Sequence, residues 1–437
     1  MSLVKNKIFL SNLLNPVSDK SAQWLPDTGL WLEKIRGKSE YRIKKIQKNS
    51  ILLAQAKKLR SVEVIDKTDI IMTPTFCDLH FHWVQDDVRD MPKDDLLFWL
   101  KNYTWPTENK FKSASYTKKK IKSFSKQLVQ SGTLSGGCYS SIHSHATELA
   151  IEGFPGEIII GNVQMTMNSP DYLLQTKEDC LKTTRCLSKK YKARYAVTPR
   201  FAITTHPDVM NKSAGFAKKN QSFIQTHLSE TKEEVQAVMD IYSAIPGFEK
   251  VKSYTEVYEK SGILGPKTIM GHGIYLNQKE LRILKNSRTA IAHCPTSNAP
   301  ISKKGLGSGL FDLKTISKNK IRWALGSDIG AGPYLSMVDV LNSFVSQHKD
   351  LGLANFTSAF YRATLAGEKI LQESDRRGSF KVGKDGSFLC WKVNSLAILK
   401  NKTPEEVLRK VFFVPSSRRD DCGVLNQSTV WKGQKLY

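Results

Sequence analysis

Cysteine is scarce in this chain and does not occur in the paired spacings of metal knuckles or disulfide frameworks. Seven cysteines are scattered over 437 residues, at positions 77, 138, 180, 186, 294, 390 and 422. Their number is odd, and no two of them form a CxxC pair. This usage argues against a disulfide scaffold and against a cysteine zinc site. Because reduced thiols are typical of the cytoplasm, we expect a cytoplasmic protein.

Long apolar runs are also missing, although hydrophobic residues make up 40% of the chain. No run approaches the roughly 20 residues that a membrane-spanning helix needs. The segment MSLVKNKIFLSNLLNPVSDK at the start holds one short apolar stretch, which Ser and Asn interrupt, and no clear cleavage site. We therefore expect a soluble globular protein with a large core, no secretion signal and no membrane partner.

Acidic residues are few relative to basic ones. Asp and Glu number 41 against 66 Lys and Arg, so the formal net charge is +25. Nucleic-acid binding would be one explanation of this charge. The densest basic stretch, KSASYTKKKIKSFSKQ at residues 113–128, instead has the pattern of a helix with a solvated lysine face. The chain contains no recognisable nucleic-acid motif, so we expect a lysine-rich surface and no nucleic-acid partner.

The two ends of the chain differ from its middle. Residues 1–70 and 380–437 contain short strand-like segments: KIFLSNLL, YRIKKIQ, SILLAQ and SVEVID in the first range, GSFLCWKV and STVWKGQKLY in the second. We predict that both ends pair in one small β-sandwich-like domain. Residues 71–379 instead alternate β-branched runs with helical patterns such as TKEEVQAVMDIYS and SMVDVLNSFVSQH.

Eight strand-like runs in the middle predict a parallel barrel. They are IIMTPTFCDLH, TLSGGCYSSIH, EIIIGNVQM, YAVTPRFAI, SFIQTHL, TIMGH, TAIAH and WALGSD. Eight alternating β/α units are typical of a (β/α)8 barrel of the TIM type, so the predicted fold class is α/β with a flanking β domain. Six of the eight runs end on or beside His or Asp. In such barrels the C-terminal ends of the strands carry the chemistry.

Histidine is concentrated at these strand ends. In a strand, residues i and i+2 point to the same face, so His80 and His82 could hold one ion together. Zinc takes three or four protein ligands, so other runs must supply the rest. The further candidates at strand ends are His227, His272, His293 and Asp328. Their convergence at one end of a barrel predicts a metal site.

An ordered set of motifs resembles the amidohydrolase superfamily and, within it, the guanine deaminases. The motifs are CDLHFH (77–82), LLFWLKNYTWPTENKF (96–111), VTPRF (197–201), THLSE (226–230), GHG (271–273), AHCPTSN (292–298) and GSDIGAG (326–332). The H-x-H motif alone is unspecific, whereas the stretch at 96–111 and the order of the whole set are specific. Thr75 and Ser387 depart from the family pattern, which usually has Gly and Asp there; neither is an expected ligand.

The resemblance implies one Zn2+ per chain, with Fe2+ as an alternative. Three imidazole nitrogens and one carboxylate suit a zinc-type cation that keeps one water. The expected ligands are His80, His82, His227 and Asp328. A two-metal site would usually need a carboxylated lysine after the fourth strand, and TPRFAITTH contains no lysine. The sequence therefore favours a single cation.

Catalytic roles follow from the same resemblance. Asp328 can accept the proton of the water, and Glu230 can carry a proton to the ring nitrogen beside the attacked carbon. His272 has the place of a histidine that orients the attacking hydroxide in related deaminases; a fifth metal ligand is the alternative. His293 is either a residue behind the site or a structural histidine, and both interpretations stay open.

A purine base with acceptor atoms fits the remaining candidates. The guanidinium of Arg200 is donor-only and can bridge O6 and N7 of guanine, whereas adenine has an amino group at position 6. Gln85 suits an amide-like ring edge, and Phe201 can cover a ring face. The full set of expected substrate contacts is Gln85, Arg200, Phe201, His227, Glu230 and Trp83.

The resulting hypothesis is a zinc-dependent enzyme that hydrolyses guanine to xanthine and ammonia. Deamination of another guanine-like ring, a pterin or 8-oxoguanine, is a second hypothesis that uses the same residues. A scaffolding protein with a decayed barrel and a basic surface is the non-enzymatic alternative. The resemblance further implies a homodimer that binds a small-molecule purine base and water.

Overall fold

The computed structural model describes residues 6–59, 61–93, 95–393, 396–413 and 428–437. The chain divides into two compact units: an end unit (residues 1–77, 128–134 and 336–437) and a barrel unit (residues 78–127 and 135–335). This division assigns residues 336–379 to the end unit. The domain boundaries at residues 71 and 379 stay a prediction from the sequence pattern.

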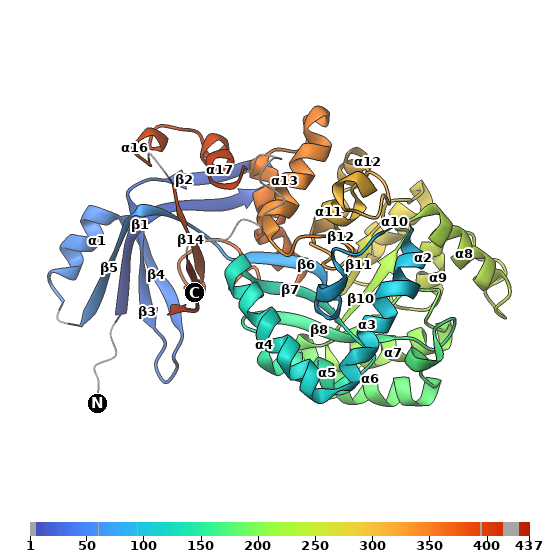
Figure 1. The fold of residues 1–437 in the computed structure, drawn as a ribbon. Helices are drawn as coiled ribbons and strands as arrows, with labels where there is room; N and C mark the ends of the chain where they lie inside the picture. Colours follow the sequence, from blue (N-terminus) through green and yellow to red (C-terminus); the bar gives the residue numbers. More distant parts are fainter. Residues whose placement is uncertain (1–5, 60, 94, 394–395, 414–427) are drawn as a thin grey trace. The chain divides into compact units, whose positions relative to one another are not determined.

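The barrel unit is built on eight strands that neighbour one another in chain order (Figure 1). They are β6 (Phe76–His82), β7 (Thr133–Ser140), β8 (Glu157–Gln164), β9 (Ala196–Pro199), β10 (Phe223–Leu228), β11 (Thr268–His272), β12 (Ala290–His293) and β13 (Arg322–Leu325). From β7 to β13 each strand pairs with the next in parallel, for example β10 with β11. Backbone N–H groups of Asp328 and His82 donate to the carbonyls of His80 and Ile329, at 2.8 Å each. These bonds join the ends of the sheet, which confirms the predicted (β/α)8 barrel.

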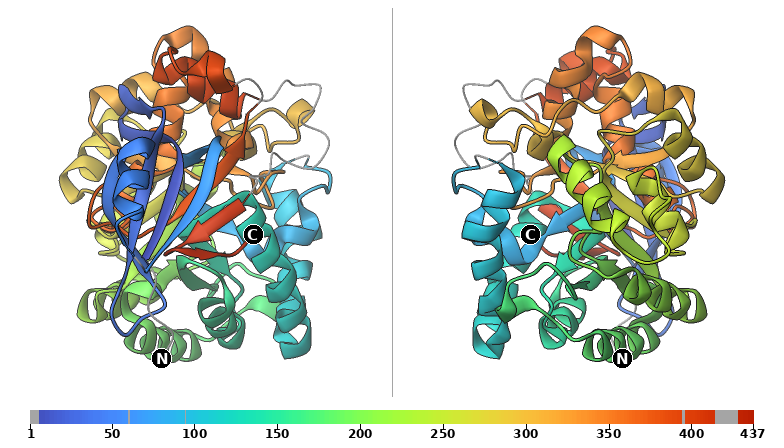
Figure 2. Two further views of the ribbon diagram at one scale, coloured as in Figure 1. Left: turned by 90° about the vertical axis from the view of Figure 1, so that its left-hand side faces the viewer. Right: turned by 90° about the vertical axis from the view of Figure 1, so that its right-hand side faces the viewer.

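Helices follow the strands and form the outer layer of the barrel unit (Figure 2). They are α4 (Ala114–Ser131), α5 (Ser144–Gly153), α6 (Lys177–Tyr191), α7 (Pro207–Asn220), α8 (Lys232–Ser243), α9 (Tyr254–Lys260), α10 (Gln278–Ser287), α11 (Pro295–Asn298) and α12 (Leu313–Lys318). Between β6 and α4 lie η1 (Trp83–Val88), α2 (Leu96–Trp99), the π-helix η2 (Leu100–Thr104) and α3 (Trp105–Asn109). The predicted helix at 113–128 is α4, and its Lys118, Lys119 and Lys122 are exposed, as a solvated lysine face requires.

The end unit pairs strands from both chain ends in one mixed sheet. Its order is β16–β15–β14–β5–β1–β3–β4, with β2 on β1. The bounds are β1 (Asn6–Ser18), β2 (Ser21–Leu25), β3 (Thr28–Lys34), β4 (Tyr41–Lys48), β5 (Val62–Thr73), β14 (Phe388–Lys392), β15 (Ser428–Trp431) and β16 (Gln434–Lys435). Ile8, Leu10 and Trp31 pack on one face under Leu52 of α1 (Asn49–Ala56), while Phe9 and Leu30 belong to a second apolar cluster. The further helices are α13 (Met337–His348), α14 (Phe356–Arg362), α15 (Leu365–Ile370), α16 (Leu396–Leu399) and α17 (Pro404–Phe412).

Two local predictions were wrong. The segment SILLAQ, expected as a strand, forms helix α1, because Leu, Ala and Gln favour helix over strand. The run IIMTPTFCDLH, expected as one strand, contains the end of β5 and the start of β6, which belong to different sheets. Pro74 lies between them and has no backbone N–H with which to continue a ladder.

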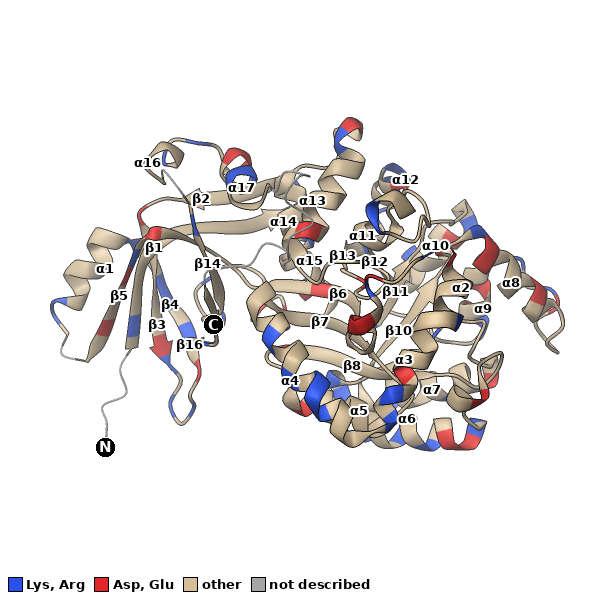
Figure 3. Ribbon diagram, viewed as in Figure 1, with Lys and Arg blue, Asp and Glu red and all other residues tan. Residues whose placement is uncertain are grey.

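Charged side chains are dispersed over the described residues. Figure 3 shows Lys and Arg interspersed with Asp and Glu on the ribbons of both units, without a continuous basic stripe in that view. Across the described ranges, no helix combines the length and the apolar character that crossing a membrane requires. Of the seven cysteines, six are described and carry free thiols, and Cys422 lies outside the described residues.

Candidate active site

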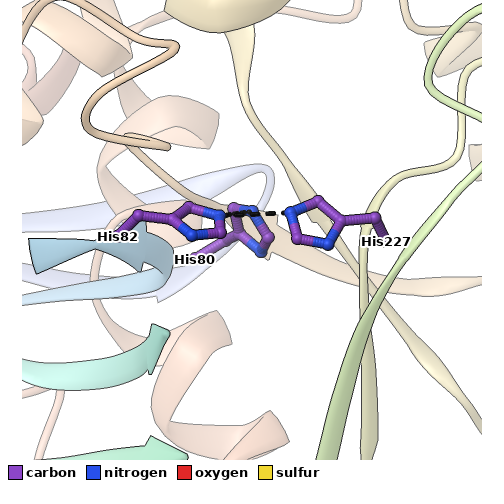
Figure 4. A group of neighbouring side chains, drawn as sticks. All are labelled: His80, His82 and His227. Atoms are coloured by element: carbon purple, nitrogen blue, oxygen red, sulfur yellow. Dashed lines mark hydrogen bonds between the residues drawn. The ribbon is translucent and has the colours of Figure 1, made fainter. Parts of the chain in front are cut away.

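Four of the predicted ligands converge at the C-terminal ends of three barrel strands. The Nε2 atom of His82 lies 3.3 Å from that of His80 and 3.1 Å from that of His227. Figure 4 shows the three imidazoles turned toward one another, with His80 on β6 beside His82 and His227 facing them from β10. The Oδ1 atom of Asp328 lies 3.2 Å from His80 Nε2 and 3.4 Å from His82 Nε2. All four side chains are buried or nearly so.

These separations fit a single tetrahedral cation. Ligand atoms at about 2.0–2.1 Å from a tetrahedral centre lie about 3.3–3.4 Å apart, close to the distances found here. Burial lowers the pKa of His80, and it lowers the pKa of His82 and His227 further, together with the neighbouring imidazoles. The imidazoles are therefore neutral, and their Nε2 atoms face one another at short distances. A cation between them would relieve the repulsion of the facing lone pairs.

The surroundings of His227 and Asp328 also suit a cation. His227 Nδ1 lies 2.6 Å from the carbonyl of Arg200 and donates to it, which leaves Nε2 unprotonated. The Oδ1 atom of Asp328 faces the Nε2 atoms of both His80 and His82, so this carboxylate supplies the one anionic donor of the cluster. The donor set is thus three neutral nitrogens and one carboxylate, the combination expected for Zn2+.

Two glycines allow the backbone to approach His80 closely. A Cβ atom at Gly271 in β11 would lie 2.7 Å from His80 Cε1. A Cβ atom at Gly326 would lie 2.9 Å from His80 Cβ. Beside these glycines, His272 and Asp328 have positive φ angles of 70° and 50°, a conformation that non-glycine residues rarely adopt and that clusters at functional sites.

His272 lies beside the ligand cluster and is oriented by an amide. Its Nδ1 atom is 3.1 Å from Asn298 Oδ1, so it donates to that oxygen. Its Nε2 atom then faces the site, 3.4 Å from Glu230 Oε2 and 3.9 Å from Asp328 Oδ2. This geometry supports an orienting role. Because His272 also groups with His80 and Asp328 within ligand distance, the fifth-ligand alternative stays open.

Glu230 is a buried carboxyl group held on two sides. The hydroxyl of Ser308 donates to its Oε1 at 3.1 Å, and its backbone N–H donates to Glu234 Oε2 at 2.6 Å. Burial raises the pKa of Glu230 well above its usual range, and the negative charge of Asp328 raises it further. A raised pKa favours the protonated form of this carboxyl group, from which a proton can be transferred during a reaction.

A cavity opens onto this cluster. Its wall includes His82, Gln85, Leu96, Trp99, Leu100, Arg200, Phe201, His227, Glu230, Glu234, His272, Leu306, Asp328 and Ala331. Apolar and aromatic walls with a few convergent polar groups are typical of small-molecule sites. Gln85 and Arg200 form one polar wall, because both donate to the buried carboxylate of Glu108, at 2.9 Å and 2.6 Å.

Two candidates from the sequence lie elsewhere. Trp83 is not among the cavity-lining residues; its buried indole packs against the rings of Phe111, Phe124 and Phe154. His293 does not line the cavity either, and its ring stacks on Phe311 with centroids 4.2 Å apart. The stacking supports the structural interpretation of His293.

Sequence reasoning missed several residues that hold the site together. Glu108, Asn298 and Ser308 each bond to a predicted site residue. Glu108 and Asn298 stood within quoted motifs, TWPTENKF and AHCPTSN, so the motif itself was the available signal. Ser308 lies in a glycine-containing loop without such a signal. The lining residues Leu96, Trp99 and Leu100 also come from the quoted 96–111 stretch.

Known proteins are similar to this chain in sequence and fold. The profile of the Amidohydrolase family matches residues 71–433. The chain is 32% identical over 341 residues to guanine deaminase of Escherichia coli, covering 75% of this chain and 74% of that protein. It is 31% identical over 405 residues to guanine deaminase of Dictyostelium discoideum, covering 87% of each.

A solved structure agrees with these relatives. The crystal structure of guanine deaminase from C. acetobutylicum, with guanine bound in its active site, superposes with a TM-score of 0.84 and 26% identity. The match covers 99% of this chain and 100% of that chain. Together with the barrel and its ligand cluster, the family match over residues 71–433 shows that the chain belongs to the Amidohydrolase family.

Proposed function

We propose that this chain is a zinc-dependent guanine deaminase that converts guanine and water to xanthine and ammonia. One observation carries the proposal: a single cavity is lined by three members of the His–His–His–Asp cluster (His82, His227 and Asp328), by Glu230 and by the Arg200–Gln85 wall. The similarity to proteins named guanine deaminase supports the choice of base.

His80, His82, His227 and Asp328 would hold one Zn2+ per chain, with Fe2+ as the alternative. A cation bound there lowers the pKa of a coordinated water, so that hydroxide is available near neutral pH. Asp328, the one carboxylate among the candidate ligands, would take up the proton that this water loses. The three imidazoles would thus serve only to hold the ion, whereas Asp328 would hold the ion and also accept a proton.

Glu230 and His272 would carry out the proton chemistry on the ring. Addition of water oxygen to C2 and cleavage of the C2–N bond require a proton on ring N3 and then one on the departing amine. Glu230 lies in the cavity wall, and its raised pKa suits it to supply the first proton. His272, oriented by Asn298, presents Nε2 toward the same space and can stabilise the developing charge.

Arg200, Gln85 and Phe201 would bind the base. Arg200 is 2% exposed and carries its guanidinium into the cavity wall, where it can donate to O6 and N7. Phe201 offers a ring face from the same wall. Water exclusion by Trp99, Leu100 and Leu306 strengthens these polar contacts, because the local dielectric is low.

We also propose that the chain works in the cytoplasm as a homodimer, without nucleic-acid or membrane partners. The support is the resemblance to guanine deaminases and the absence of disulfide spacing in the sequence. Gel filtration with light scattering measures the assembly directly.

A metal assay combined with a substrate screen tests the proposal. Purified protein is expected to contain about one zinc-type ion per chain and to release ammonia fastest from guanine, compared with adenine, cytosine, 8-oxoguanine and a pterin. His82→Ala should lose both metal and activity, while His145→Ala, outside the cavity wall, should keep both.

Each other outcome points to a specific error. Two ions per chain, or full activity after thorough chelation, contradicts the single-cation mechanism. If a pterin or 8-oxoguanine is deaminated faster than guanine, the substrate assignment is wrong and the proposed mechanism is unaffected. Bound metal without ammonia release from any ring favours the scaffolding alternative.

A further inference from the structure

Glu108 occupies a position behind the substrate wall that the mechanism so far does not use. It belongs to α3, directly after the π-helix η2, a helix type often found at functional sites. Its side chain is 1% exposed. The carboxylate accepts from Gln85 Nε2 at 2.9 Å with Oε1 and from Arg200 Nη1 at 2.6 Å with Oε2. One buried anion therefore contacts both polar residues of the wall.

The carboxylate dictates how the amide of Gln85 is turned. An ionised carboxylate only accepts hydrogen bonds, so the nitrogen of Gln85 must face Glu108. Its Oε1 then faces the cavity that Gln85 lines, and no described residue bonds to this oxygen. Arg200 uses one nitrogen for Glu108, and its other N–H groups remain available as donors.

We propose that Glu108 is a positioning residue that sets the hydrogen-bond polarity of the base-binding wall, with Gln85 as acceptor and Arg200 as donor. This inference rests on the proposed function. The polarity matches a cyclic amide edge, in which a carbonyl acceptor adjoins an N–H donor, as O6 and N1–H do in guanine. An adenine-like edge has the reverse order and would meet donor with donor and acceptor with acceptor.

The rival explanation is that Glu108 only neutralises Arg200 and supports the fold. Under that explanation, loss of the carboxylate would weaken the binding and turnover of all bases to a similar extent. The positioning role predicts a change of selectivity instead. In Glu108→Gln, the new amide can donate to Gln85 Oε1 and turn the Gln85 nitrogen toward the cavity. The wall would then favour an unprotonated N1 over an N1–H group.

Steady-state deamination of guanine and 2-aminopurine by the full-length metal-loaded protein measures this selectivity. Both bases carry the amino group at C2, but 2-aminopurine lacks O6 and has an unprotonated N1. We expect Glu108→Gln to lower kcat/KM for guanine by roughly 100-fold, as an unpaired buried polar group would. The value for 2-aminopurine should stay within about fivefold of wild type or rise.

Equilibrium binding of two bases without an amino group provides a readout apart from turnover. Hypoxanthine keeps O6 and N1–H, whereas purine lacks both. Calorimetric titration should show that the wild type binds hypoxanthine much more tightly than purine. In Glu108→Gln the difference between the two Kd values should largely disappear. The matched control is Glu280→Gln: Glu280 is also buried and accepts backbone N–H bonds, but it does not line the cavity. This control should keep the wild-type ratio.

The outcomes separate the inference from the function it rests on. An equal loss for both bases, or an unchanged ratio in Glu108→Gln, overturns the positioning role while guanine deamination stands. A wild-type protein that deaminates neither base overturns the proposed function itself. If Glu108→Gln does not fold, Gln85→Leu removes the cavity-facing acceptor and leaves the Glu108–Arg200 pair; an unchanged hypoxanthine preference there also overturns the inference.

Discussion

Several buried polar side chains at the site are held by a specific partner. Ser308 donates to Glu230, Asn298 accepts from His272, and the Arg200 carbonyl accepts from His227. Each contact determines which atom of its partner faces the cavity. The chemistry of the site thus depends on single hydrogen bonds, and single substitutions should change one function at a time.

Glu230→Gln should keep the metal and the fold but lose most turnover. The amide is nearly isosteric and can still accept from Ser308, yet it cannot shuttle a proton, so we expect kcat to fall by roughly 10²–10⁴-fold. Ammonia release and elemental analysis on the same preparation measure both properties. Glu233→Gln, on the exposed face of α8, is the control and should behave as wild type. Near wild-type turnover in Glu230→Gln would exclude it as the proton carrier.

Strands and helices place these side chains through close backbone packing. Strand β11 brings Gly271 against the ring of His80 on β6, although the two strands are not neighbours in the sheet. Helix α8 begins with a capping box of Thr231 and Glu234, and Glu234 also binds the backbone N–H of Glu230. The same elements that form the barrel therefore set the ligand geometry.

Gly271→Ala should weaken metal binding without unfolding the barrel. The added methyl group would lie 2.7 Å from His80 Cε1, so the imidazole must move by a few tenths of an ångström or more. We expect metal affinity to fall by about 10- to 100-fold, as displaced ligand geometry does elsewhere. Competition with a chromogenic chelator measures this affinity. Gly215→Ala, in α7 with no atom within 4 Å of the new Cβ, is the matched control. Equal affinities in the two variants would contradict the packing argument.

Glu234→Gln should change the pH dependence of stability. Burial raises the pKa of Glu234 from 4.5 to about 7, and the charge of Glu230 adds to this rise. A folded-state pKa above the unfolded value means that the stability contributed by the protonated carboxyl is complete below about 4.5. This contribution is lost as the pH rises through about 7. At pH 8 this loss lowers the free energy of unfolding of the wild type by about 3 kcal/mol. The Glu234→Gln variant should not show this loss, because glutamine does not ionise.

Thermal melting of both proteins between pH 5 and pH 8 measures this effect. The melting temperature of Glu234→Gln relative to wild type should rise by several degrees across the range. Contributions common to both proteins, metal dissociation included, cancel in the difference. A difference that is constant with pH would mean that Glu234 does not titrate in this range.

At the scale of the whole molecule, a cation at the proposed site would couple metal binding to stability, because the candidate ligands come from β6, β10 and the segment after β13. A cation that binds only the folded state stabilises it by mass action. The net charge of +25 acts differently: dispersed lysines favour solubility and salt-dependent, non-specific attraction to polyanions, and they carry no information about the reaction.

Removal of the metal should lower the melting temperature of the protein by several degrees, since occupancy at 100 times Kd contributes about 2.7 kcal/mol. Differential scanning calorimetry before chelation, after chelation and after zinc addition measures the effect, which should be reversible. His82→Ala should melt at the same temperature in all three conditions. A wild-type melting temperature that chelation leaves unchanged would argue against a cation held by three strands.

Local patterns in the sequence determined the barrel and the main candidate ligands. β-branched runs that alternate with helical stretches predict consecutive β/α units. Eight such units predict that the sheet closes into a barrel. His80, His82, His227 and Asp328 end such units, so their convergence follows from the topology of parallel strands. SILLAQ failed as a prediction because a short apolar segment carries no clear period and helix propensity decided it.

Contacts between distant segments were decided only by the tertiary structure. Glu108 meets Arg200 across 92 residues, and Ser308 meets Glu230 across 78. These pairings depend on how η2, α3 and the loop before α12 pack. The spacing of residues within one element does not predict this packing. The position of Trp83 was decided in the same way. It directly follows His82 in the sequence, which suggested a place beside the site, but its indole packs against the rings of Phe111, Phe124 and Phe154. Sequence periodicity specifies which face of an element is buried, but partner identity depends on side-chain packing between elements, which only the folded chain defines.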